Sequence, residues 1–139
     1  MSAPSSTRPP WLKLLVGGRI LVAGSFLLTP RLVARAFGMR SAGTPAIAMG
    51  RMFAIRNAAL AAGLLKLESF AEPKTFVGAN ILIDTVDAAA FLAAGRRREL
   101  EPITTVLATA VAVSAVVAGA GALAQLRADA TVAAETTTG

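Results

Sequence analysis

Four long apolar segments, separated by short polar stretches, dominate the chain. They cover residues 11–29, 46–67, 75–94 and 103–126, and the first is closed by Pro30. Proline cannot continue a helix without the loss of a backbone hydrogen bond. Each segment matches the ~20 residues that a helix needs to cross ~30 Å of hydrocarbon. The pattern therefore predicts an all-α fold, an integral membrane four-helix bundle with four spans.

Residues 30–43, between the first two segments, follow a different pattern. Arg31 and Arg35 lie four positions apart, while Leu32, Val33 and Phe37 offer an apolar side. A helix of this kind lies along the lipid headgroups. Residues 1–10 and 128–139 are polar and predicted to be disordered tails. We therefore expect a single transmembrane domain over residues 11–127.

Composition and charge agree with a membrane protein. The chain is 55% hydrophobic and only 16% charged, with a mean hydropathy of +0.63, unlike ordinary soluble domains. It has no Cys and no His, which removes thiolate sites, disulfides and the usual haem ligand, zinc ligand and general base. We expect no metal, no cofactor and no enzymatic activity. The net charge of +6 comes from basic residues that flank or interrupt apolar segments, so contact with anionic lipids is expected and nucleic-acid binding is not.

Ionisable residues inside the apolar segments are the most informative feature of the chain. Charges at the centre of a bilayer are costly, so they normally face a bundle interior and find partners. Asn80, Asp84 and Asp87 are spaced four and three apart and share one stripe of their helix. Asn57, beside Arg56, can add hydrogen bonds to the same polar layer. The predicted intramembrane polar layer consists of Arg19, Arg51, Arg56, Asn57, Asn80, Asp84 and Asp87.

Depth along antiparallel spans predicts how these charges pair. Arg19, Arg56 and Asp84 each lie about ten residues from the segment ends that meet on one side, which is ~15 Å at 1.5 Å per residue. Arg51 and Asp87 lie nearer that side. We therefore expect pairs between Arg56 and Asp84 and between Arg51 and Asp87. Such pairs either hold the bundle in register or bind a proton, cation or headgroup.

Arg19 is the cation that this pairing leaves over. A buried guanidinium needs an acid, and arginine suits bidentate contact with carboxylate or phosphate. We expect Arg19 to take an acid from a partner helix or a lipid phosphate, or to share Asp84 with Arg56.

Small residues recur every four positions in the fourth segment. Such a face lets helices approach closely in lipid. It serves either packing inside the monomer or docking against another membrane protein. The predicted face consists of Ser114, Ala115, Ala118, Gly119 and Ala122.

Short motifs over residues 12–95 resemble a group of small bacterial membrane proteins. They are Gly18–Arg19, Pro30, Phe37–Gly38, Gly50–Arg51, Ala54–Ile55–Arg56–Asn57, Gly63–Leu64–Leu65, Asp84 and Asp87–Ala88. In this order they resemble uncharacterised four-helix proteins of the DoxX-like type. The resemblance implies a four-helix membrane fold, and it implies no activity, ligand or catalytic residue.

These observations lead to two functional hypotheses. The first is a small accessory subunit that docks on and stabilises a larger plasma-membrane complex, with lipid or hydrophobic-solute transport as the process it serves. The alternative is a self-contained carrier or lipid-binding protein, as a monomer or a homo-oligomer, that uses Asp84 and Asp87 to bind a proton, cation or headgroup. Both place a multi-pass protein in the plasma (inner) membrane. Six Lys and Arg residues on the side of Arg35 and Arg97, against five on the other, favour a cytoplasmic location for that side.

Overall fold

The computed structural model describes residues 8–137, and every regular element in that range is a helix. The elements are α1 (Pro10–Leu28), α2 (Pro30–Ala36), α3 (Ala46–Leu65), the short 3₁₀ helix η1 (Leu67–Ser69), α4 (Pro73–Arg96) and α5 (Pro102–Thr137). Residues 1–7 of the predicted N-terminal tail and residues 138–139 of the C-terminal one lie outside the described residues.

The all-helical class is confirmed, and among the described residues three helices are long and apolar enough to cross a membrane. These are α1, α4 and α5. The 20-residue α3 is not among them, because Arg51, Arg56 and Asn57 make it less apolar. The structure therefore supports a helical membrane protein with three candidate spans.

Prolines set the starts of most helices. Pro10, Pro30 and Pro73 begin α1, α2 and α4, and Pro102 begins α5. Proline suits this first position because its fixed φ matches the helix and its missing N–H would have no partner there. Pro30 also separates α1 from α2, with Thr29 between them. The breaks between helices thus follow from local sequence.

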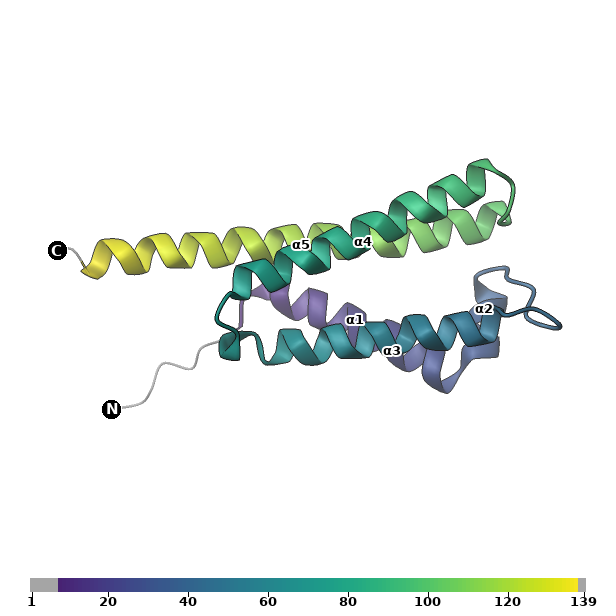
Figure 1. Cartoon of the computed structure of the whole chain (residues 1–139), viewed down its shortest axis with the longest axis horizontal. Coiled ribbons are helices and arrows are strands. Elements are labelled where there is room, and N and C mark those ends of the chain that lie inside the picture. The colour runs from purple at the N-terminus through teal and green to yellow at the C-terminus, as the bar shows by residue number, and fades with distance from the viewer. Residues whose placement is uncertain (1–7, 138–139) are drawn as a thin grey trace.

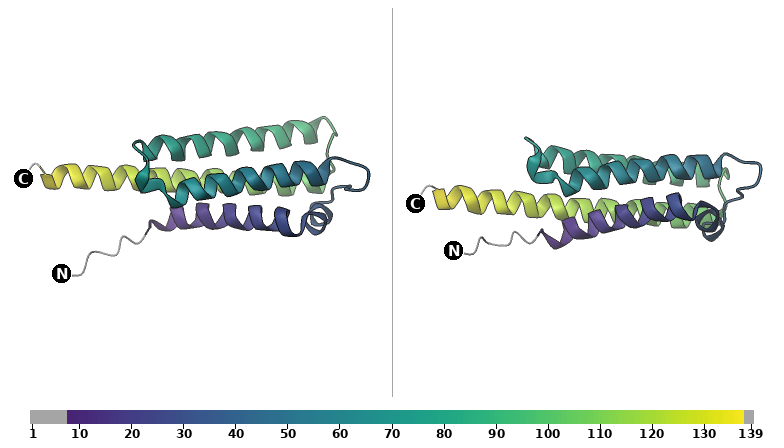
Figure 2. Two further views of the ribbon diagram at one scale, coloured as in Figure 1. Left: turned by 60° about the horizontal axis from the view of Figure 1, so that its bottom comes forward. Right: turned by 90° about the horizontal axis from the view of Figure 1, so that it is seen from below.

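The long helices form two pairs. α1 packs along α3, α4 packs along α5, and α1 also contacts α5, whereas α3 and α4 make few direct contacts (Figure 1). The short α2 lies crosswise to the long helices, next to α3 and the end of α1 (Figure 2). The pairs are therefore joined mainly along the α1–α5 side.

At one end of the bundle the two pairs are tightly packed. We call this the packed end. An apolar core lies here, formed by the start of α1, the end of α3, the start of α4 and the second half of α5. Its buried residues are Leu12, Leu15, Val16, Leu64, Leu67, Val77, Ala118 and Ala122. Phe70 and Phe76 stack beside it with ring centroids 4.7 Å apart.

At the opposite end the two pairs separate around a cavity. This open end comprises the second half of α1, α2, the start of α3, the end of α4 and the start of α5. The pairs touch again at its extremity, where the Thr104 hydroxyl donates a 2.6 Å hydrogen bond to the Phe37 carbonyl oxygen. Gly38, next to Phe37, has a φ of +70°, and a Cβ there would collide with Ile103, so glycine is needed at this contact.

The last helix is longer than predicted. The fourth segment was expected to end near residue 126 and to be followed by a disordered tail, but α5 continues to Thr137. Residues 127–136 are exposed and project beyond the packed end (Figure 1). This segment contains four alanines and no glycine or proline, and alanine has the highest helix propensity. The predicted tail is therefore helical as far as it is described.

Candidate functional site

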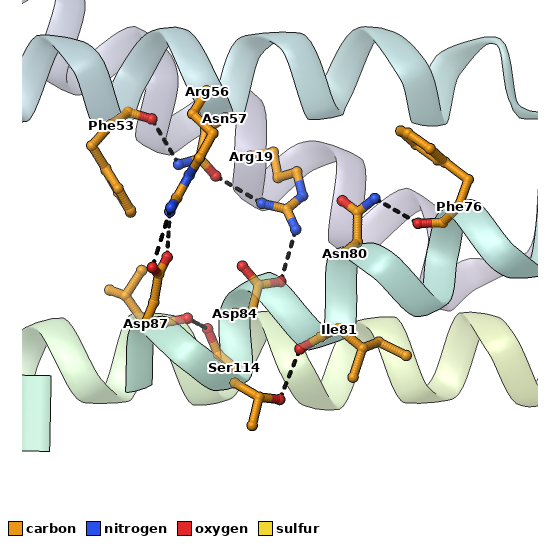
Figure 3. Close-up of polar contacts among 12 residues, drawn as sticks. Arg19, Phe53, Arg56, Asn57, Phe76, Asn80, Ile81, Asp84, Asp87 and Ser114 are labelled. Carbon is orange, nitrogen blue, oxygen red and sulfur yellow. Dashed lines mark hydrogen bonds and ion pairs between the residues drawn. The ribbon is translucent and has the colours of Figure 1, made fainter. Parts of the chain in front are cut away.

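A buried ion pair links three helices in the middle of the bundle. Arg19 Nη2 on α1 lies 2.7 Å from Asp84 Oδ2 on α4, and Arg19 Nη1 donates a 2.9 Å hydrogen bond to Asn57 Oδ1 on α3 (Figure 3). Arg19 is 2% exposed and Asp84 is 4% exposed. The contact with Asp84 on α4 joins the two helix pairs, whereas the contact with Asn57 lies within the α1–α3 pair.

Two asparagines are oriented by their own helices. Asn57 Nδ2 donates to the Phe53 carbonyl oxygen at 3.0 Å, which leaves Asn57 Oδ1 to accept from Arg19. Asn80 Nδ2 donates in the same way to the Phe76 carbonyl oxygen at 2.9 Å. Both asparagines are buried, and a buried amide needs such partners to offset its desolvation. Asn80 lies one turn from Asp84 and extends the polar stripe of α4.

A second ion pair lies nearer the surface. Arg56 on α3 makes two hydrogen bonds to Asp87 on α4, one of them 3.2 Å long from Nη1 to Oδ1. The Arg56 guanidinium carbon also lies 4.8 Å from the centre of the Phe53 ring, within cation–π range. The side chains of Arg56 and Asp87 are 37% and 19% exposed. This pair bridges α3 and α4, which otherwise make few contacts.

The predicted pairing of the charges is wrong. Asp84 pairs with Arg19 instead of Arg56, and Asp87 pairs with Arg56 instead of Arg51. The reason is helix order: α1 packs along α3, and its arginine contacts both Asn57 and Asp84. Arg19, expected to be the cation left over, is the most buried charge of the described chain. Of the acids expected for it, it takes Asp84, but it does not share this carboxylate with Arg56. We call Arg19, Arg56, Asn57, Asp84 and Asp87 the polar cluster.

Arg51 lies outside the polar cluster. Its side chain is exposed, and it forms no ion pair with any residue that the structure describes. Five positions separate it from Arg56, which is about 140° around a helix. The helix that directs Arg56 toward Asp87 therefore directs Arg51 away from it.

The small-residue face of α5 points mostly into the monomer. Ala118, Gly119 and Ala122 are buried, and a Cβ added to Gly119 would lie 2.7 Å from Ile81 Cγ1 on α4. Ala115 is partly buried, whereas Ser114 is exposed and donates to the Val111 carbonyl oxygen. Of the two interpretations of this face, packing inside the monomer is the one that these contacts support.

A small cavity of about 100 Å³ adjoins the polar cluster. Arg19, Asn57, Asp84 and Asp87 contribute to its lining, and Arg19 Nε is buried without a hydrogen-bond partner among the described residues. A cavity of this size has room for water, and these side chains supply the polar partners that a buried water needs. The carboxylates of Asp84 and Asp87 are each paired with a guanidinium group, which favours a structural role for the two aspartates. Within residues 8–137 no cluster of three or more acidic side chains could hold a metal ion.

The large cavity at the open end was not predicted. Its volume is about 1560 Å³, above the roughly 300–1,000 Å³ of most small-molecule sites. Apolar side chains from all five α-helices form its walls, and four of the six phenylalanines are among them. These wall residues include Leu21, Val22, Phe26, Leu32, Val33, Phe37, Met49, Phe53, Phe91, Leu92, Val106 and Val111. No sequence signal marks them, because each has the apolar character of an ordinary membrane-helix residue.

The two cavities share a boundary. Val22, Phe53, Phe91, Ala108 and Val111 line both of them. The polar cluster therefore lies at the inner limit of the large apolar cavity. The outer limit carries charged residues, namely Arg40, Arg96, Arg98, Glu99 and Glu101.

Comparisons of this chain with protein-family models, curated proteins and solved structures found no match. The resemblance to DoxX-like proteins stays a prediction. What this protein does must be argued from the two cavities and the polar cluster between the helix pairs.

Proposed function

We propose that this chain is a multi-pass protein of the plasma membrane that binds a hydrophobic or amphipathic molecule between its two helix pairs. α1, α3, α4 and α5 are the four spans of this proposal. α3 lies alongside α1, and its Arg56 and Asn57 turn toward partners on α4 and α1. The observation that carries the proposal is the apolar cavity of about 1560 Å³ at the open end.

The cavity is too large to be an ordinary packing defect. It is also open to the surroundings, because the wall residues Leu21, Leu32 and Val106 are more than half exposed, and these apolar side chains lack van der Waals contacts with other parts of the protein. The packed end of the same bundle has a continuous core with fully buried Leu15, Leu64 and Val77. A molecule with apolar chains restores the missing contacts at the open end, so a bound ligand accounts for the cavity.

The polar cluster supports this function by holding the helix pairs together at the inner limit of the cavity. Removal of one partner of a buried pair is costly because the remaining charge has no counter-charge. Arg19 with Asp84 therefore opposes separation of the pairs, and the more exposed pair of Arg56 with Asp87 adds a smaller contribution.

We favour this self-contained binding protein over an accessory subunit. The accessory hypothesis was motivated by the small-residue face of α5 and by an unpaired Arg19. Ala118 and Ala122 are buried in the monomer core, and Arg19 pairs with Asp84. Docking on a larger complex therefore lacks the two features that suggested it.

Filling the cavity tests the proposal. Ala46 on α3 lines the cavity, whereas Ala48, two positions away, is exposed and does not line it. The protein is reconstituted in vesicles of phosphatidylcholine and phosphatidylglycerol, extracted in mild detergent and analysed by native mass spectrometry. We expect the parent and Ala48→Trp to retain lipid and Ala46→Trp to retain several-fold less. Equal retention by the two tryptophan variants, or none by the parent, would refute the proposal.

A further inference from the structure

We infer that the cavity binds an anionic phospholipid, with the phosphate against Arg40, Arg96 and Arg98 and the acyl chains along the apolar walls. This inference rests on the proposed function and specifies its ligand class. Three arginines and two glutamates, Glu99 and Glu101, line the outer part of the cavity. Within this lining, cations therefore outnumber anions.

The arginines at the cavity are available for an anion. Arg40, Arg96 and Arg98 are exposed. Neither ion pair of the described chain involves them or the two glutamates. A guanidinium group presents a planar fork of donors that matches a phosphate. The side chains thus offer donors that no acceptor within residues 8–137 uses.

Charge is also distributed unequally between the ends of the bundle. The open end carries six arginines against the two glutamates, and the cations are Arg31, Arg35, Arg40, Arg96, Arg97 and Arg98. The packed end carries five basic residues against four acidic ones, which are Arg8, Lys13, Lys66, Lys74 and Arg127 against Glu68, Glu72, Asp129 and Glu135. Clustered basic residues at a membrane surface attract anionic lipids. The cavity lies at the end with the larger positive excess.

The length of the cavity matches one leaflet of a bilayer. On α5 the lining of the cavity runs from Pro102 at its outer limit to Val111, which also borders the small cavity. Nine residues of helix separate them, which is about 14 Å at 1.5 Å per residue. Half of a hydrocarbon core is about 15 Å thick. An acyl chain held between the helix pairs would therefore reach from the arginines to the polar cluster.

The turn between α4 and α5 holds two of these arginines in place. Arg98 N donates to the Gly95 carbonyl oxygen and Glu99 N to the Ala94 carbonyl oxygen, each at 3.0 Å. Arg98 has a φ of +58°, a left-handed conformation that asparagine adopts more readily than most residues. Arg98→Asn therefore removes the charge while it preserves the turn.

The test compares two pairs of arginines at the same end. One variant combines Arg96→Gln with Arg98→Asn at the cavity, and the control combines Arg31→Gln with Arg35→Gln on α2, outside the cavity lining. Vesicles of equal parts phosphatidylglycerol and phosphatidylcholine supply the lipid, and native mass spectrometry identifies what each protein retains. We expect a preference for phosphatidylglycerol that falls about tenfold in the cavity variant and less than about twofold in the control.

Several results would overturn the inference. If the parent retains both lipids equally, or if the two double variants lose the preference equally, the cavity binds lipid without recognising the headgroup, and the proposed function stands alone. If inorganic phosphate added in excess displaces the bound lipid, the arginines form a site for a free anion. If the parent retains no lipid, the proposed function fails as well. Thermal unfolding of all variants verifies that these exposed substitutions leave the fold intact.

Discussion

The packed end and the open end are built from the same long helices, yet only one of them closes. At the packed end small residues admit side chains from the other helix pair: Gly63 on α3 lies against Phe76 on α4, and Gly121 on α5 lies against Trp11 on α1. At the open end Gly38 meets Ile103 of the other pair at the extremity, but the glycines of the long helices act within a pair. Gly50 on α3 lies against Phe26 on α1, and Gly95 on α4 lies against Thr105 on α5.

This difference explains how one bundle contains both a core and a cavity. Close approach of helices requires small residues at the contact, so their positions decide which helices meet. At the packed end they bring the pairs together. At the open end the glycines of the long helices tighten each pair separately, and the space between the pairs is left to the phenylalanine side chains and the cavity. The polar cluster lies between the packed end and the open end, and its ion pairs join the two helix pairs.

Breaking the polar cluster should have the largest effect, since it would separate the pairs at both ends. Asp84→Ala leaves the 2% exposed Arg19 without a counter-charge, which we expect to cost about 3–5 kcal/mol of stability. Thermal unfolding in mild detergent measures the loss. The exchange variant Arg19→Asp with Asp84→Arg should recover part of it.

Asp87→Ala is the matched control for this change. It removes a carboxylate from a pair whose side chains are 37% and 19% exposed, so solvent screening should limit its cost to about 1 kcal/mol or less. If Asp84→Ala and Asp87→Ala destabilise the protein equally, the buried pair does not dominate the joining of the helix pairs.

Enlarging a small residue should distinguish the two ends. Ala118→Leu inserts three carbons into the packed core, and we expect a cost of about 1–3 kcal/mol from overpacking. Ala36→Leu adds the same atoms at an exposed position that lines the cavity, and its cost should stay below about 0.5 kcal/mol. Unfolding temperatures of the two variants give the comparison. A stable Ala118→Leu protein would show that the α5 face is not part of the core.

Arg51→Leu should have the smallest effect. Arg51 is exposed and unpaired within the described chain, so we expect the stability to change by less than about 0.5 kcal/mol. Arg19→Leu provides the contrast, because it leaves the buried Asp84 carboxylate without its guanidinium partner. Both are followed by thermal unfolding. A large loss on Arg51→Leu would mean that α3 depends on this arginine in a way that its exposure does not indicate.

Features that depend on neighbouring residues were predictable. The starts of α1, α2 and α4 coincide with prolines, whose restricted φ acts on the residues next to them. The stripe of Asn80, Asp84 and Asp87 follows from the helical repeat, and all three point toward the interior or its edge. Residues 128–137 are the exception: their polarity predicts a disordered tail, but their alanine content favours the helix that the structure shows.

Features that depend on how helices pack against each other were decided only by the tertiary structure. By itself the sequence determined that the chain is helical, that it is apolar enough for a membrane and that charged side chains must be buried in the middle of its helices. It did not determine that Arg19 would pair with Asp84, that Ala118 would face the core or that a cavity would form beside Phe53. Several arrangements of the helices are compatible with the same depths of the charged residues and the same spacing of the apolar ones. The choice among these arrangements depends on small residues and charges that lie far apart along the chain. Those contacts exist only once the helices have packed.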